Sequence, residues 1–149
     1  MAKVIAVCIS EKRGLPKTEK PYIETQVNHG IIGDAHAGDW HRQISLLAIE
    51  SINTMRDLGF DLKNGAFAEN IITQGIILAK LPVGTLLQVG KTQLEITQIG
   101  KECHSDCAII QATGKCIMPK EGVFAKVMVG GRIASGDAIS ILEKTDETD

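Results

Sequence analysis

Short apolar runs, bounded by glycine, proline or asparagine, follow one another along most of the chain. Seven of them are rich in β-branched residues or alternate apolar with polar positions: residues 3–10, 22–27, 42–48, 84–90, 91–100, 122–131 and 137–144. Both patterns are typical of β-strands that are joined by turns. Gly90 and Lys91 predict a tight hairpin turn, and Gly130 and Gly131 predict a second turn.

A different period marks residues 48–58. The apolar positions of this segment recur with threefold spacing, at Ile49, Ile52, Met55 and Leu58. Polar residues lie between them and Gly59 follows, so we expect an amphipathic helix that ends at this glycine. A second, shorter helical or irregular piece is expected at residues 108–113.

Many short strands and few helices favour a mainly β fold of the β-rich α+β class. We expect an antiparallel β-barrel with one or two packed helices. Parallel α/β wrapping is disfavoured because helical segments do not alternate with strands along the chain. Residues 1–144 are expected to form a single domain, and the acidic tail at residues 145–149 is expected to fray.

Composition narrows the class of protein further. A chain of 149 residues with 44% hydrophobic residues can bury its own core without cross-links. The formal net charge of −2 lacks the basic excess of nucleic-acid binders. The first apolar run, residues 4–9, is too short for an export signal or a membrane span. We therefore expect a cytoplasmic protein whose cysteines stay reduced, with no nucleic-acid or membrane partner.

Three of the four cysteines gather in the polar stretch GKECHSDCAIIQATGKCIMP, residues 100–119. Cys103, Cys107, Cys116 and His104 could supply the four ligands of a structural zinc site. The C-x3-C spacing differs from the usual C-x2-C pair, and adjacent Cys103 and His104 point apart in an extended backbone. The alternative for Cys107 and Cys116 is that each is a small buried hydrophobic residue, and Cys8 is expected in a core strand.

Cys103 is the best candidate for a reactive thiol. It follows the strand at 91–100 and Lys101, whose ammonium favours the nucleophilic thiolate, as does His104. The acidic neighbours Glu102 and Asp106 act in the opposite direction. A thiolate at this position could bind a soft metal or carry a sulfane sulfur as a persulfide.

Two further segments concentrate polar side chains. In residues 30–48, Arg42 could grip an anionic group while His36 and His41 donate hydrogen bonds or bind a metal. The alternative is a solvated loop whose aspartates stabilise turns. In residues 65–75, Glu69 and Asn70 lie in a half-buried stretch, where they either tie a loop to the barrel or line a ligand cleft.

Four segments taken together resemble the MOSC domain, named for the C-terminal part of molybdenum-cofactor sulfurases. They are GDAHAGDWHRQISLLA, GAFAENIITQGI, LPVGTLLQVGKTQLEITQIGKEC and GVFAKVMVGGRIASGDAI. The resemblance covers nearly the whole chain, which looks like a small stand-alone bacterial member. It implies a strongly bent antiparallel β-barrel.

The resemblance also implies a function. In the family, the cysteine after the strand carries sulfur or ligates molybdenum, and Cys103 occupies that position. The cleft that holds molybdopterin is expected to use Arg42, Glu69 and Asn70, with His36, His41 and Lys101 as further candidates for cofactor binding. No pyridoxal phosphate is expected, because the chain has no desulfurase domain.

The leading hypothesis is therefore a domain that binds the molybdenum cofactor and carries sulfur, or ligates the metal, through Cys103. Its expected partners are cofactor-biosynthesis proteins or molybdoenzymes, with a desulfurase as possible sulfur donor. One alternative is the cofactor subunit of a molybdenum-dependent reductase of N-hydroxylated compounds. The other is a non-catalytic interaction module stabilised by zinc.

Overall fold

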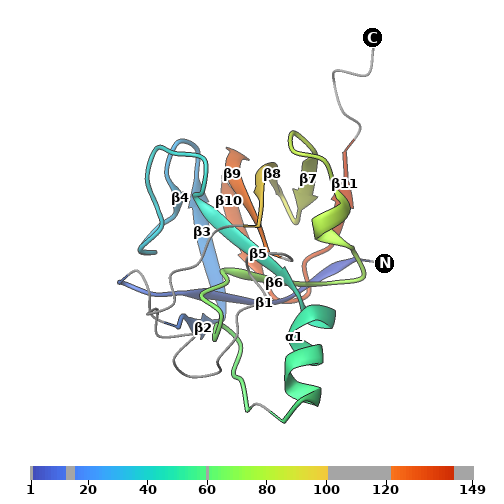
Figure 1. Cartoon of the computed structure of the whole chain (residues 1–149). Helices are drawn as coiled ribbons and strands as arrows, with labels where there is room; N and C mark the ends of the chain where they lie inside the picture. Colours follow the sequence, from blue (N-terminus) through green and yellow to red (C-terminus); the bar gives the residue numbers. More distant parts are fainter. Residues whose placement is uncertain (1, 13–15, 60, 101–121, 143–149) are drawn as a thin grey trace.

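The computed structural model describes residues 2–12, 16–59, 61–100 and 122–142 (Figure 1). These residues form strands, one α-helix and one short 3-10 helix, in the order β1 (Lys3–Ile9), β2 (Thr18–Lys20), β3 (Tyr22–Gln26), β4 (Gly30–Ile31), β5 (Ile44–Ala48), α1 (Ile49–Asp57), β6 (Ile71–Gln74), η1 (Leu78–Lys80), β7 (Leu86–Val89), β8 (Thr92–Ile99), β9 (Val123–Val129), β10 (Gly131–Ala134) and β11 (Ile139–Ile141). The mainly β, β-rich α+β class is thus confirmed.

The strands form two open sheets and not the predicted closed barrel. One sheet has eight strands in the order β11-β7-β8-β9-β5-β6-β1-β2, and the other has three in the order β10-β3-β4. The N-terminal end of β1 meets the start of β11 at an isolated bridge between Lys3 and Ala138, flanked by two backbone hydrogen bonds, from Val4 to Asp137 and from Ile139 to Ala2. Because this bridge does not extend into a ladder, the larger sheet stays open and the barrel prediction is wrong.

All seven predicted strands are present, as β1, β3, β5, β7, β8, β9 and β11. The predicted hairpin is confirmed as well, since Val89 pairs with Thr92 across a turn at Gly90, which has φ +59. The turn at Gly130 and Gly131 connects β9 to β10. The short strands β2, β4, β6 and β10 were not predicted.

The predicted helix is confirmed at Ile49–Asp57, close to the expected bounds. It ends where Gly59 adopts φ +104 and donates its N–H to the carbonyl of Arg56. The helix connects β5 to β6, which pair in parallel, and Figure 1 shows it below these two strands. Among the described strands this is the one parallel pairing, and all other pairs are antiparallel. The second helical piece predicted at 108–113 lies outside the described residues.

Two hydrophobic clusters form the core. The larger one joins the two sheets, with Ile23 and Ile133 of the smaller sheet meeting Leu94 and Ile96 of the larger. The second cluster lies under α1 and includes Ile52, Met55, Phe67 and Phe124. Burying each large aliphatic side chain contributes about 1.5–3 kcal/mol, so the helix is held by its packed face.

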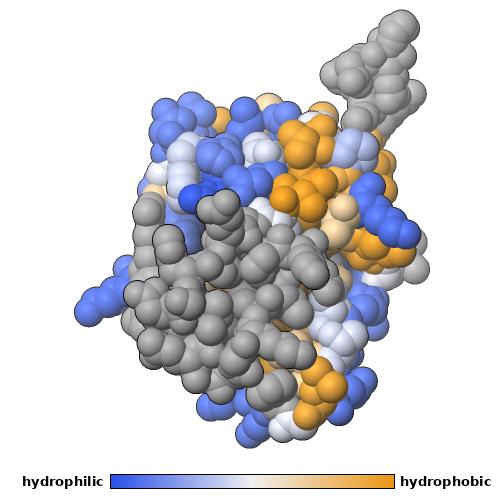
Figure 2. Space-filling view, viewed as in Figure 1, coloured by the Kyte–Doolittle hydropathy of each residue, from blue (hydrophilic) through white to orange (hydrophobic). Residues whose placement is uncertain are grey.

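Hydrophobic surface is concentrated on one part of the face in Figure 2, at its upper right, over η1 and the nearby ends of β7 and β11. Exposed apolar side chains of this region include Ile77, Val83 and Ile141. The helices in the described part of the chain have nine and three residues, which is too short to cross a membrane.

Candidate functional site

Arg42 lies where the loop from residue 33 enters strand β5. Its guanidinium carbon is 4.8 Å from the centre of the Trp40 ring and 5.6 Å from that of Phe124, so two aromatic rings hold the cation. The side chain is half-buried, and its Nε atom is buried with no hydrogen-bond partner among the described residues. Buried polar atoms are nearly always paired, which marks this nitrogen as a donor in need of an acceptor.

The loop before Arg42 is fixed by Asp34. The Oδ1 atom of this buried carboxylate accepts from the Lys17 ammonium at 2.8 Å and from the Ser10 backbone N–H at 3.1 Å. Its Oδ2 atom accepts from the His36 N–H at 3.0 Å. Both oxygens of Asp34 are thus engaged within the protein, so this carboxylate holds the loop in place.

The same loop contacts the C-terminal end of β8. The Thr97 hydroxyl donates to the carbonyl oxygens of His41 and Phe124, and Nε2 of His41 is 2.8 Å from Oε1 of Gln98. The described chain continues only to Gly100, three residues before Cys103. Arg42 therefore stands beside the strand that leads toward the predicted thiol.

The predicted residues in the cysteine-rich segment lie outside the described residues: Lys101, Cys103, His104, Cys107 and Cys116. The roles expected of Cys103 and Lys101, and the zinc alternative, therefore stay predictions. Where the structure does describe the chain, no three His, Cys, Asp or Glu side chains gather to hold a metal ion.

The two predicted histidines occupy different settings. His41 is exposed and bonded to Gln98. His36 is half-buried, with Nδ1 3.7 Å from Oδ2 of Asp34, and its carbonyl oxygen accepts from the Trp40 indole N–H at 2.8 Å. His41 thus presents its ring to solvent beside the loop, whereas His36 helps to fix the position of Trp40 under the guanidinium.

Glu69 and Asn70 are fully buried and bonded to backbone. The Glu69 carboxylate accepts from the N–H groups of Gly65 at 2.8 Å and Phe67 at 2.9 Å. Burial raises the pKa of Glu69, while these hydrogen bonds and the charge of Arg56 lower it. The side chain of Asn70 accepts from the Ser45 N–H and donates to the Cys8 carbonyl oxygen, which links β5 to β1. These hydrogen bonds tie the loop before β6 to the sheet, which is the structural one of the two roles expected for Glu69 and Asn70.

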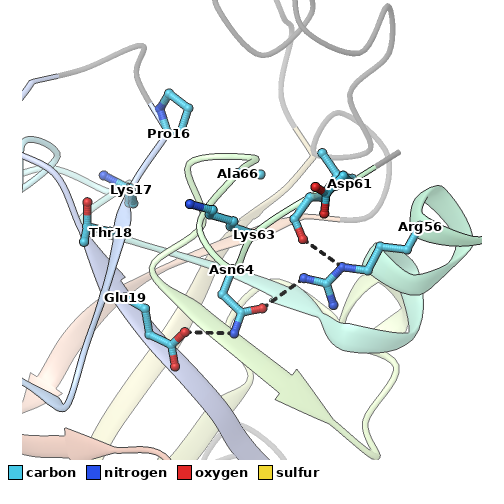
Figure 3. Close-up of a pocket in the computed structure, with 10 residues that line it drawn as sticks. Pro16, Lys17, Thr18, Glu19, Arg56, Asp61, Lys63, Asn64 and Ala66 are labelled. Atoms are coloured by element: carbon cyan, nitrogen blue, oxygen red, sulfur yellow. Dashed lines mark hydrogen bonds between the residues drawn. The ribbon is translucent and has the colours of Figure 1, made fainter. Parts of the chain in front are cut away.

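A groove of about 880 Å³ formed by described residues was not predicted from the sequence. Ten residues line it: Pro16, Lys17, Thr18, Glu19, Arg56, Asp61, Leu62, Lys63, Asn64 and Ala66 (Figure 3). The Asn64-Gly65 pair is a turn signal in the sequence. No local sequence signal brings this turn beside Lys17, because strands β2 to β5 and helix α1 lie between them along the chain.

Cys8 is confirmed as a core residue of β1, with no exposed surface. Burial, with smaller contributions from the charges of Glu69 and Glu19, raises its pKa to about 12. Because the thiolate is the reactive form, this cysteine is inert in the folded protein.

Comparison with known proteins places the chain in a family. The family model described as "MOSC domain" matches residues 33–140, which is more than half of the chain. Among curated proteins, no sequence match is found. The matched region contains the Arg42 loop, Glu69, Asn70 and the cysteine-rich segment.

Solved structures resemble the fold over nearly its whole length. The YuaD protein from Bacillus subtilis has a TM-score of 0.76 and 18% identity, covering 93% of this chain and 94% of that one. YiiM from Geobacillus stearothermophilus has a TM-score of 0.72 and 16% identity, covering 96% and 76%. YiiM from Escherichia coli has a TM-score of 0.68 and 14% identity, covering 97% and 71%. At these identities the likeness shows a shared fold.

Proposed function

The chain belongs to the MOSC domain family, which is related to the C-terminal domain of molybdenum-cofactor sulfurases, and we propose that it binds the molybdenum cofactor. In this proposal Cys103 ligates the metal or carries sulfur to it. The single observation that carries the proposal is the buried Nε of Arg42, which lacks a hydrogen-bond partner among the described residues.

The setting of Arg42 suits an anionic group. A guanidinium presents a planar fork of donors that matches a phosphate or carboxylate, and such charge-assisted hydrogen bonds are about twice as strong as neutral ones. The rings of Trp40 and Phe124 hold the fork in one orientation before a ligand arrives. We therefore assign to Arg42 the binding of an anionic oxygen of the cofactor.

The other predicted residues have supporting roles in this proposal. His41, the exposed residue that precedes Arg42 in the chain, donates a hydrogen bond to the cofactor. Asp34 and His36 fix the loop and the position of Trp40. Glu69 and Asn70 act as positioning residues, since neither exposes side-chain surface for direct contact.

Covalent reach supports the role of Cys103. Three residues of extended chain span at most about 10 Å, and Cys103 comes three residues after Gly100 in the sequence. The Gly100 carbonyl oxygen accepts from the side chain of Gln98, which also bonds His41. When bound, the cofactor supplies a redox-active metal with exchangeable sulfur or oxygen ligands. To load sulfur, the Cys103 thiolate attacks the outer sulfur of a donor persulfide. A new S–S bond forms on Cys103, the donor's S–S bond breaks, and the donor leaves as its thiolate.

Anaerobic purification from cells that make the cofactor tests the proposal. Wild-type protein is expected to retain molybdenum and pterin, measured by metal analysis and by fluorescence of the oxidised pterin. Arg42→Ala is expected to lose most of both. Arg132→Ala is the matched control. The guanidinium carbon of Arg132 also lies over an aromatic ring, 4.1 Å from the centre of the Tyr22 ring, but Arg132 belongs to β10 and not to the loop that carries Arg42.

A second set of variants identifies the thiol. If Cys103 ligates the metal, Cys103→Ala should lose the metal. If Cys103 carries sulfur, mass spectrometry should find one added sulfur atom on its peptide in wild type and none in Cys103→Ala. Cys107→Ala and Cys116→Ala should behave like wild type in both measurements. Wild-type protein without metal, pterin or added sulfur after exposure to cofactor and a persulfide donor would rule out the proposal. Unfolding by a chelator would favour the zinc alternative.

A further inference from the structure

We infer that the groove between β2 and residues 61–66 is a second binding site, which takes a small zwitterion of the amino-acid type with an apolar side chain. It shares no lining residue with the Arg42 site, so this inference does not depend on the proposed function. Its volume of about 880 Å³ lies within the usual range of small-molecule sites.

Charges of both signs line the groove. Lys63 and Arg56 contribute cations, and Glu19 and Asp61 contribute carboxylates. Lys17 adds no free charge, because its ammonium is buried against Asp34. A ligand with only one charge would leave the opposite set unmatched, whereas a zwitterion complements both.

These four charged groups do not neutralise one another. Among the described residues, none of the four forms an ion pair within 4.0 Å. Asn64 separates two of them, since its amide donates to Glu19 at 3.0 Å and its carbonyl oxygen accepts from Arg56 at 3.1 Å (Figure 3). The charges are thus held apart across the groove, where a ligand can reach them.

Lys63 and Glu19 are the most direct candidates for contact with a ligand. Both are exposed, and they belong to opposite walls, since Lys63 lies in the 61–66 segment and Glu19 in β2. In Figure 3 the Lys63 side chain extends toward the segment that carries Lys17 and Thr18. We assign the ligand carboxylate to Lys63 and its ammonium to Glu19, with Leu62, Ala66 and Pro16 contacting the apolar side chain.

The wall formed by residues 61–66 is organised before a ligand binds. The Arg56 guanidinium donates to the carbonyl oxygen of Leu62 at 3.0 Å, and Glu69 holds the N–H of Gly65. Gly65 in turn accepts from the backbone N–H of Lys17 at 2.8 Å, which joins this wall to the opposite one. A site fixed in this way loses little conformational entropy on binding.

The test compares the binding of three matched probes to the full chain. Binding is measured from the shifts of backbone amide NMR signals as each probe is added. L-phenylalanine carries both charges, 3-phenylpropionate lacks the ammonium and 2-phenylethylamine lacks the carboxylate. We expect phenylalanine to bind at least about tenfold more tightly than either analogue, with shifts centred on residues 18–19 and 62–66. Equal affinities, or no shifts with phenylalanine, would overturn the inference.

Two variants test which residue binds the carboxylate of the ligand and which binds its ammonium. Lys63→Met should weaken phenylalanine and 3-phenylpropionate by about tenfold without affecting 2-phenylethylamine. Glu19→Gln, which still accepts from Asn64, should weaken phenylalanine and 2-phenylethylamine only. Lys91→Met and Glu95→Gln, outside the groove, should change nothing. Unchanged binding in both groove variants would overturn the inference, whatever the outcome for cofactor binding by Arg42→Ala.

Discussion

The ammonium of Lys17 donates to a carboxylate oxygen of Asp34 at 2.8 Å, and neither side chain exposes any surface. This buried pair joins two parts of the molecule. Lys17 lies in a wall of the groove, and Asp34 fixes the loop that leads to Arg42. A change at either residue therefore affects both candidate sites.

Removing one member of this pair should strongly destabilise the protein. Lys17→Met leaves the Asp34 carboxylate buried without its countercharge, and we expect the free energy of unfolding in urea to fall by about 3–5 kcal/mol. Lys126→Met is the control, because Lys126 is 3.7 Å from Glu95 and that pair is 44% and 29% exposed. Its cost should stay below about 1 kcal/mol. Similar costs for both variants would contradict the assigned burial.

Gly65 should tolerate no side chain. It has φ +92, and a Cβ atom there would lie 2.2 Å from the Lys17 carbonyl oxygen. We expect Gly65→Ala to cost about 3–5 kcal/mol and to distort the groove. At Gly59, with φ +104, a Cβ would meet nothing within 4 Å, so Gly59→Ala should cost only about 1–2 kcal/mol. Equal costs in chemical denaturation would show that crowding against Lys17 is absent.

The buried carboxyl of Glu69 should give stability a specific pH dependence. Burial raises its pKa in the folded protein above the value of about 4.3 expected in the unfolded chain. The folded state then binds the proton more tightly, so this contribution to stability is present below about pH 4 and is lost as pH rises through the raised pKa.

Glu69→Gln removes that titration and, since an amide cannot accept from both backbone N–H groups, adds a cost of about 1–3 kcal/mol. The stability advantage of wild type over Glu69→Gln should therefore shrink as pH rises from 4 to neutrality, measured by urea unfolding at each pH. An advantage that grows with pH would mean that the two N–H donors outweigh burial and lower the pKa.

Cys8 should resist chemical labelling in the folded protein. With a pKa of about 12 and no exposure, it has almost no thiolate at pH 8. Peptide mass spectrometry after treatment with iodoacetamide should find Cys8 unmodified in native protein and fully modified in urea. Rapid labelling of native Cys8 would contradict its place in the core.

Several parts of the fold could be predicted from local sequence alone. Alternating apolar positions identified β8, and threefold spacing identified α1 almost to its bounds. Strand β6 was missed, because its short apolar sequence is buried on both faces and gives no alternation. The parallel pairing of β5 with β6 follows from the crossover through α1, which depends on tertiary packing.

The candidate site was predictable only in its residue types. Arg42 stood out as a cation in a glycine-rich loop, and the structure adds the rings of Trp40 and Phe124 that hold it. Phe124 is 82 positions away along the chain, so no local pattern could indicate that contact. Glu69 shows the converse, since a carboxylate in a half-buried segment is equally compatible with ligand binding and with its observed contacts to backbone N–H groups.

The most direct test of the account uses Trp40, the single tryptophan of the chain, which lies under the Arg42 guanidinium. Anaerobic titration of the protein with molybdenum cofactor should quench Trp40 fluorescence to saturation. Arg42→Ala should weaken binding at least about tenfold, as expected for the loss of charge-assisted hydrogen bonds, and Arg132→Ala should bind like wild type. Unchanged Trp40 emission, or equal affinity in Arg42→Ala, would contradict the proposal that the cofactor binds at Arg42.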